Sequence, residues 1–293
     1  MPLFGHMIGL FDSGYGGLTV LKALRKRLPQ YDYLYLGDNL RVPYGSRSPE
    51  TIREFSEEAL HFFFKKNIPL TIFACNTASA VALPCLQEKY LRTPNVTDSV
   101  ASLADKKVLG VIIPVAEKAI KITKNKRIAI VGTRATINSK AYEKELHKLD
   151  PNIKTLGQAC PLLVPLIEEG WHHKPEARSI LKKYLAPIKD FAPDTLILGC
   201  THYPIMHDVF EDIMGTRVHV LDSSTAVADS LADYLNRHPE IESQLTKSSD
   251  TTNSSASAKL GTVTFTCTDA PERFSEFAQK FLGERVIAEI VKL

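Results

Sequence analysis

The chain has 293 residues, of which 44% are hydrophobic and 24% charged, and its formal net charge is +3 at pH 7. This length predicts two domains, and this composition excludes intrinsic disorder for most of the chain. Basic and acidic residues are interspersed, which argues against a nucleic-acid-binding or membrane-surface protein. The sequence has neither an apolar run long enough for a membrane span nor the blocks of a signal peptide. We therefore expect a compact cytoplasmic protein.

Short β-rich apolar runs alternate with segments of helical periodicity along the whole chain. Strands are predicted at 8–11, 33–36, 70–74, 108–113, 127–131, 153–157, 195–198, 218–221 and 262–266. Helical segments lie between most of them, and one starts at Ser48 with Pro49 in its first turn. This alternation predicts an α/β fold with mainly parallel sheets.

Polar clusters follow two predicted strands in each half of the sequence. In the first half they contain Asp12 and Cys75, and in the second half Thr133 and Cys200, at similar spacing. The recurrence predicts an internal duplication. Ligands of open α/β sheets bind beyond the carboxyl ends of the strands, so two such halves would place two thiols across one cleft.

The five cysteines include no CxxC pair, so we expect neither a disulfide framework nor a metal site. Cys85, Cys160 and Cys267 are interpreted as small buried apolar residues. For Cys75 and Cys200, a position just before a helix start predicts a lowered thiol pKa and a usable base.

Two opposed thiols suit the removal of a proton from one face of a carbon and its delivery to the other face. A cysteine hydrolase needs only one thiol together with a histidine base. Amide and hydroxyl donors beside both thiols indicate a small anionic ligand. His202 is placed to tune the proton affinity of Cys200, whereas His207 is interpreted as an ordinary surface or core histidine.

A series of ordered motifs resembles the glutamate racemases of the aspartate/glutamate racemase superfamily. The motifs are IGLFDSGYGG from Ile8, RVPYG from Arg41, ACNTAS from Ala74, GTRATI from Gly132, VPLIE from Val164 and LGCTHYP from Leu198. The similarity extends from Ile8 to about Asp222. It implies a racemase without cofactor or metal that interconverts L- and D-glutamate for bacterial peptidoglycan precursors, and usually a homodimer.

The resemblance also implies two pseudo-symmetric domains with the active site in the cleft between them. The first would comprise 8–112 together with the C-terminal segment 225–293, and the second 113–224. The stretches 94–107 and 243–259 look like insertions. The second of these is rich in Ser, Thr, Asp and Ala, which predicts a flexible loop.

Carried over by motif, Cys75 and Cys200 are the paired acid/base residues. The resemblance assigns Cys75 to proton abstraction from D-glutamate, assisted by Asp12, and Cys200 to abstraction from L-glutamate, assisted by His202 and Glu168. Glu168 is preferred to Glu169 because it directly follows the VPLI motif. The residues that match substrate-binding positions are Asp12, Ser13, Pro43, Tyr44, Gly45, Asn76, Thr77, Thr133, Thr136, Thr201 and His202.

Two alternatives stay open at this point. The first is a related racemase that acts on aspartate, a hydantoin or a broad range of amino acids. The second is a small-anion binding protein whose cysteines are structural, which would not exchange the ligand's Cα proton with solvent. A nucleotide enzyme is disfavoured, since the glycines from Gly14 do not complete GxGxxG and GxxxxGK[ST] is absent from the sequence.

Overall fold

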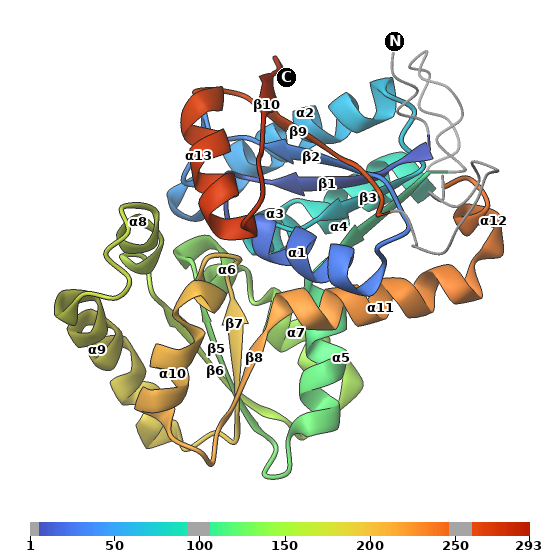
Figure 1. Ribbon diagram of the computed structural model, residues 1–293. Helices are drawn as coiled ribbons and strands as arrows, with labels where there is room; N and C mark the ends of the chain where they lie inside the picture. Colours follow the sequence, from blue (N-terminus) through green and yellow to red (C-terminus); the bar gives the residue numbers. More distant parts are fainter. Residues whose placement is uncertain (1–5, 93–105, 246–259) are drawn as a thin grey trace, which may run out of the picture.

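The computed structural model describes residues 6–92, 106–245 and 260–293. Its strands form two sheets, one above the other in Figure 1, and helices flank both. Every strand pair in the described ranges is parallel, which confirms the predicted α/β class.

The larger sheet has the strand order β10-β9-β2-β1-β3-β4. Its strands are β1 (Ile8–Asp12), β2 (Tyr33–Gly37), β3 (Leu70–Phe73), β4 (Lys107–Gly110), β9 (Val263–Cys267) and β10 (Ala288–Ile290). The helices of this half are α1 (Leu18–Arg27), α2 (Pro49–Lys65), α3 (Asn76–Val81), α4 (Leu83–Gln87) and α13 (Pro271–Leu282), with a 3-10 turn at Tyr44–Ser46 and a π-helical turn at Glu88–Arg92.

The smaller sheet has the order β6-β5-β7-β8. Its strands are β5 (Arg127–Gly132), β6 (Lys154–Ala159), β7 (Thr195–Gly199) and β8 (His219–Asp222). The helices of this half are α5 (Ile112–Ile122), α6 (Arg134–Ser139), α7 (Ala141–Leu149), α8 (Leu163–Glu168), α9 (Pro175–Phe191) and α10 (His207–Met214), with a 3-10 turn at Tyr203–Met206. The order β2-β1-β3-β4 in the larger sheet matches β6-β5-β7-β8, as an internal duplication would produce.

The strands are apolar on both faces because helices cover both faces. In the larger sheet Leu10 and Ile72 point into one core, while Phe11 and Phe73 point into a second core on the other face. Residues of the smaller sheet such as Ile130 join the first core, which is therefore shared between the two halves. This shared core positions the two sheets relative to each other.

The predicted start of α2 is confirmed: the Ser48 hydroxyl accepts a hydrogen bond from the Thr51 amide, and Pro49 occupies the first turn. The predicted strand 108–113 is wrong in its second half, because β4 ends at Gly110 and α5 begins at Ile112. Pro114 lies in the first turn of α5, where a helix needs no amide donor. The interpretation of Cys85 as buried is also wrong, since this cysteine is exposed.

After the smaller sheet is complete, the chain returns to the larger sheet through β9 and β10 (Figure 1). The expected domain boundaries at 112 and 224 fall at the first residue of α5 and in the first turn of α11 (Ser223–Arg237), which is followed by α12 (Pro239–Glu242). Helix α11 packs against both α1 and α5, so it spans the junction. Residues 246–259 of the predicted flexible loop, and 94–105 of the other expected insertion, lie outside the described residues.

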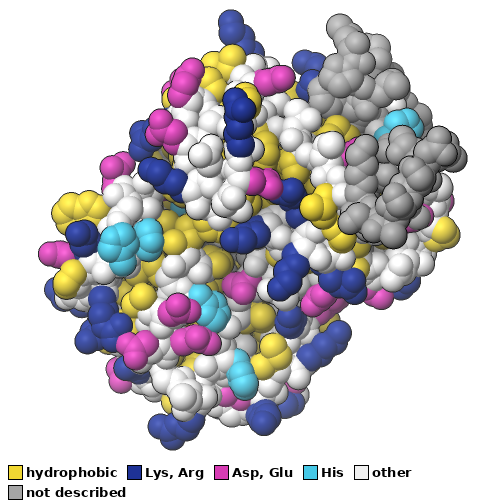
Figure 2. All heavy atoms as spheres, in the orientation of Figure 1, with side chains coloured by type: hydrophobic (Ala, Val, Ile, Leu, Met, Phe, Trp, Pro, Cys, Tyr) yellow, Lys and Arg dark blue, Asp and Glu magenta, His cyan; other side chains and the backbone are white. Residues whose placement is uncertain are grey.

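Figure 2 shows basic and acidic side chains intermixed over the face in view. This agrees with the interspersed charges of the sequence. Among the helices that the structure describes, none has both the length and the apolar character that crossing a bilayer requires.

Candidate active site

Four strand ends, two from each sheet, meet at one cavity. Strands β1 and β3 lead into Ser13 and Cys75, and strands β5 and β7 lead into Thr133 and Cys200. All four residues line the cavity. The two thiols are nearly inaccessible, with exposures of 4% for Cys75 and 5% for Cys200. The structure therefore brings both cysteines into one buried site, at the edge where parallel sheets place their ligands.

Most of the residues selected from the sequence share this cavity. Those that line it are Ser13, Pro43, Tyr44, Gly45, Cys75, Asn76, Thr77, Thr133, Glu168, Cys200, Thr201 and His202. Asp12 and Thr136 do not line it but lie directly behind it, bonded to lining residues.

The sequence analysis did not select six residues that also line the cavity: Val42, Ser46, Arg134, Pro161, Val164 and Pro165. Val42, Arg134, Val164 and Pro165 stand inside the quoted motifs, so their position within a motif was a usable signal. Ser46 directly follows the RVPYG motif, and Pro161 carries no comparable signal.

On the first side of the cavity, the Cys75 sulfur lies 3.3 Å from the Ser13 hydroxyl oxygen. Burial raises the pKa of the Cys75 thiol to about 12, and the negative charge of Asp12 acts in the same direction. The predicted lowering of this pKa is therefore wrong, because desolvation outweighs the short helix that follows. At neutral pH Cys75 holds its proton.

Asp12 lies at the end of β1 and is fully buried. Its Oδ1 accepts a hydrogen bond of 3.0 Å from the Gly14 amide, and its Oδ2 accepts one of 3.4 Å from the Thr201 hydroxyl. Burial raises the pKa of the carboxyl group, and the charge of His202 opposes this shift. Asp12 thus connects the Cys75 side to the Cys200 loop.

On the second side, the Cys200 sulfur lies 3.9 Å from Nδ1 of His202. The Nε2 of His202 lies 3.0 Å from a carboxylate oxygen of Glu168, which α8 supplies. Burial alone would lower the pKa of His202, but its hydrogen bonds with Cys200 and Glu168 raise it to about 10. Glu169 instead pairs with Arg273 at 3.3 Å on the surface, so Glu168 is the acid at this site.

Three threonine hydroxyls bond to one another across the junction of the two halves. The oxygen of Thr77 lies 2.9 Å from that of Thr133 and 3.3 Å from that of Thr136, and the last two are 3.0 Å apart. Gly45 packs against Thr133 so closely that a Cβ at residue 45 would lie 2.5 Å from the threonine Cβ. This close packing therefore requires a residue without a side chain at position 45.

A family model described as Asp/Glu/Hydantoin racemase matches residues 18–231. Glutamate racemases from Syntrophus aciditrophicus and Geobacter metallireducens are each 39% identical to this chain over 279 residues. Each alignment covers 95% of this chain and 93% of the relative. The chain belongs to the Asp/Glu/Hydantoin racemase family. The resemblance inferred from the motifs is thereby confirmed.

Solved structures of glutamate racemases from other organisms resemble the structure of this racemase. A glutamate racemase isoform from Bacillus anthracis superposes with a TM-score of 0.85 at 33% identity, covering 99% of this chain and 98% of the other. The glutamate racemase of Francisella tularensis, solved in complex with D-glutamate, gives a TM-score of 0.81 at 31% identity and covers 98% of each chain. The two-sheet fold of this racemase is therefore the fold of those enzymes.

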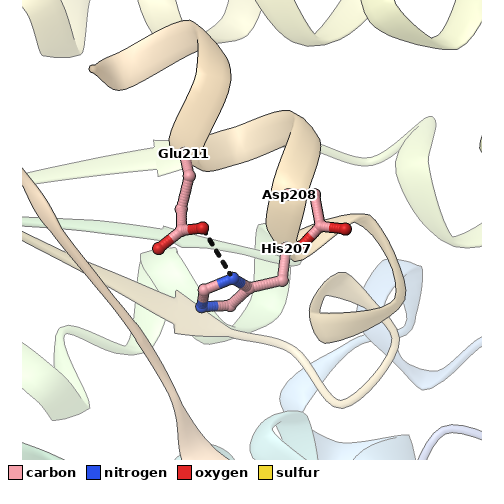
Figure 3. A group of neighbouring side chains, drawn as sticks. All are labelled: His207, Asp208 and Glu211. Atoms are coloured by element: carbon pink, nitrogen blue, oxygen red, sulfur yellow. Dashed lines mark ion pairs between the residues drawn. The ribbon is translucent and has the colours of Figure 1, made fainter. Parts of the chain in front are cut away.

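A group of side chains of the kinds that can bind metal ions lies on α10 and does not line the cavity. The ligand atoms of His207, Asp208 and Glu211 lie within 4.8 Å of one another, and His207 Nδ1 is 3.6 Å from Glu211 (Figure 3). The other ring nitrogen of His207 bonds to the carbonyl of Val220 at 3.2 Å. Both acids are exposed, so we assign to this group an ion pair at the start of α10.

Proposed function

We propose that this racemase interconverts L-glutamate and D-glutamate by proton transfer between the substrate Cα and two thiols, Cys75 and Cys200. The observation that carries the proposal is the position of both thiols in the lining of one cavity, each at the end of an equivalent strand. The relatives named glutamate racemases support glutamate as the substrate.

In the direction from L to D, Cys200 removes the Cα proton while the Cys75 thiol delivers one to the opposite face. In the direction from D to L, the two thiols exchange roles. His202 and Glu168 hold and move the proton at the Cys200 sulfur, and Asp12 acts in the same way behind Cys75. Two bases on opposite faces invert the carbon without rotating the substrate.

The substrate is held by donors from both halves. Ser13, Asn76 and Thr77 approach from the larger sheet, and Thr133 and Thr201 from the smaller one. Such donors pair with carboxylates, and they bind more tightly as charge develops on the α-carboxylate of the planar intermediate. Thr136 fixes the hydroxyls of Thr77 and Thr133, while Pro43, Tyr44 and Gly45 form one wall.

The proposal includes the setting of the enzyme. It acts in the cytoplasm, without pyridoxal phosphate or a metal, as a homodimer that supplies D-glutamate for peptidoglycan. Its first domain comprises 8–112 with 225–293, and its second 113–224. Activity that survives exhaustive dialysis against a chelator and hydroxylamine would support cofactor independence, and sedimentation equilibrium would test the dimer.

The deciding experiment follows the circular dichroism of D-glutamate and then of L-glutamate with the purified protein and no added cofactor. It is repeated in deuterated water, with mass spectrometry of the glutamate. Loss of optical activity from both enantiomers, with deuterium at Cα, is the expected result. Racemisation of aspartate or another amino acid but not of glutamate would move the chain to a different substrate class. Binding of glutamate without any exchange would favour the small-anion binding protein.

A further inference from the structure

The side-chain amide of Asn76 has one end without a partner. Asn76 lines the cavity and is 1% exposed. Its Nδ2 is buried and has no hydrogen-bond partner among the residues that the structure describes. Buried donors in folded proteins are nearly always paired, and an unpaired one is costly. A ligand acceptor in the cavity, such as a carboxylate of glutamate, would satisfy this donor.

The other end of the amide is occupied by a residue from the opposite half of the molecule. The hydroxyl of Tyr142, on α7, donates a hydrogen bond of 2.6 Å to Oδ1 of Asn76. Tyr142 is 1% exposed, and burial raises the pKa of its hydroxyl, so the group stays a donor. Within residues 6–92, 106–245 and 260–293 this hydroxyl has no second hydrogen-bond acceptor.

An amide presents an acceptor at one end and donors at the other. Because Tyr142 donates, the oxygen of Asn76 turns toward α7 and the NH₂ group remains for the cavity. The opposite orientation would leave the Tyr142 proton without an acceptor and would direct an oxygen at an anionic ligand. The single hydroxyl of Tyr142 therefore sets which end of Asn76 the substrate meets.

The ring of Tyr142 is itself fixed against the Cys200 loop. A Cβ added to Gly199 would lie 3.0 Å from Cε2 of Tyr142, so the ring packs directly on the backbone of Gly199. Tyr142 thus contacts the residue before Cys200 and the residue after Cys75. It is one side chain that connects both thiol-bearing loops across the junction of the halves.

We propose that Tyr142 is a positioning residue of this racemase, which orients Asn76 so that its amide NH₂ binds a carboxylate of the substrate. The inference rests on the proposed function, because it takes the ligand to be glutamate. Tyr142 does not touch the substrate and acts only through Asn76.

The test compares Tyr142→Phe, Asn76→Ala and the double variant by steady-state kinetics with both enantiomers. L- and D-glutamate have equal free energies, so any change in kcat/KM is the same in both directions, and the informative quantity is the division between KM and kcat. Tyr142→Phe should raise KM by about three- to tenfold and lower kcat by less than that factor. The double variant should match the kcat/KM of Asn76→Ala within about twofold, since the hydroxyl has no other route of action.

Tyr33→Phe is the matched control. Tyr33 is a fully buried tyrosine whose hydroxyl donates to the carbonyl of Leu28 at 2.8 Å, and it does not line the cavity. Its variant should keep KM within about twofold of the wild type, which separates positioning from the general loss of a buried hydrogen bond. A second variant, Asn76→Asp, keeps the shape and the acceptor for Tyr142 but removes the amide donors, so KM should rise at least as much as in Asn76→Ala.

An unchanged KM in Tyr142→Phe would overturn the inference, as would a double variant whose loss equals the product of the two single losses. If Tyr142→Phe does not fold, an unchanged KM in Asn76→Asp would overturn it instead. If the wild-type protein does not racemise glutamate, the proposed function fails and the inference fails with it. Wild-type racemisation together with an unchanged KM in Tyr142→Phe refutes the inference alone.

Discussion

Cys75 and Cys200 occupy equivalent places in the two halves but have different neighbours. Cys75 follows β3, which pairs with β1, and Cys200 follows β7, which pairs with β5 in the same way. Cys75 has a hydroxyl at 3.3 Å and the buried carboxyl group of Asp12 behind it. Cys200 has an imidazole at 3.9 Å, which is in turn 3.0 Å from Glu168.

The difference shows that the fold sets where the two thiols lie but does not set which groups surround them. The repeated strand order gives both thiols the same position, while the neighbouring residues give them opposite electrostatic surroundings. A negative charge at Asp12 acts on Cys75, and a positive charge at His202 lies beside Cys200. The thiol pKa of Cys75, raised to about 12, means that this residue holds its proton at neutral pH. Under the proposed mechanism, a protonated Cys75 is the form that donates a proton in the direction from L to D.

Removing either thiol should have the largest effect on racemisation, because each thiol is one of the two proposed proton carriers. These variants test the feature that the two sides of the site share. Cys75→Ser and Cys200→Ser should each lower kcat/KM by about 10²- to 10⁴-fold, the usual worth of a positioned acid or base. The binding of glutamate, measured by calorimetry, should stay within about tenfold. Full turnover in either variant would contradict the two-base account.

Replacing the imidazole tests what is specific to the Cys200 side. His202→Gln keeps hydrogen-bonding capacity but removes the proton carrier, and it should lower racemisation by about 100-fold. Exchange of solvent deuterium into L-glutamate, which needs Cys200, should slow more than exchange into D-glutamate. Equal slowing of the two exchange rates would remove the assignment of His202 to one side.

The adjacent acids Glu168 and Glu169 test whether the carboxylate partner of His202 matters on the Cys200 side. Glu168→Gln should lower racemisation by about tenfold, since it removes the carboxylate that holds the His202 proton. Glu169→Gln is the control: its side chain is 67% exposed and pairs with Arg273, so activity should change by less than about twofold. Equal losses in the two variants would show that Glu168 has no special role.

The smallest expected effect is on stability and follows from the pKa of His202. Folding raises this pKa from 6.5 to about 10, so the folded protein binds the proton more tightly than the unfolded chain. The stabilising contribution is fully present below about pH 6.5 and is lost as pH rises through about 10. The Tm of the wild type minus that of His202→Gln should therefore decrease by a few degrees over this range. A difference that does not change with pH would contradict the raised pKa.

The sequence was sufficient for the features that depend on local pattern. Apolar runs followed by Cys75 and Cys200 predicted strand ends, and the Ser48 and Pro49 pair predicted the start of α2. The repeat of polar clusters predicted two similar halves, and the strand orders β2-β1-β3-β4 and β6-β5-β7-β8 agree with this prediction.

Features that depend on distant segments could not be read from the sequence. The contact of Tyr142 with Asn76 joins residues from different halves, and no local pattern relates them. The raised pKa of Cys75 depends on how deeply the site is buried. The sequence analysis used only the helix that starts after Cys75, and the effect of burial is larger than the lowering expected from that helix. The end of β4 at Gly110 was missed because Ile112 and Ile113 continue an apolar run that fits a strand or a buried helix equally well.

Deuterium exchange by the two cysteine variants tests the central claim most directly, because it separates the two sides that overall racemisation combines. Each variant is incubated with pure L-glutamate or pure D-glutamate in deuterated water, and Cα deuterium is measured by mass spectrometry. The account predicts that Cys75→Ser, which retains Cys200, incorporates deuterium only into L-glutamate, and that Cys200→Ser incorporates it only into D-glutamate. Incorporation into the same enantiomer by both variants, or into both enantiomers by either one, would contradict the assignment of one thiol to each face.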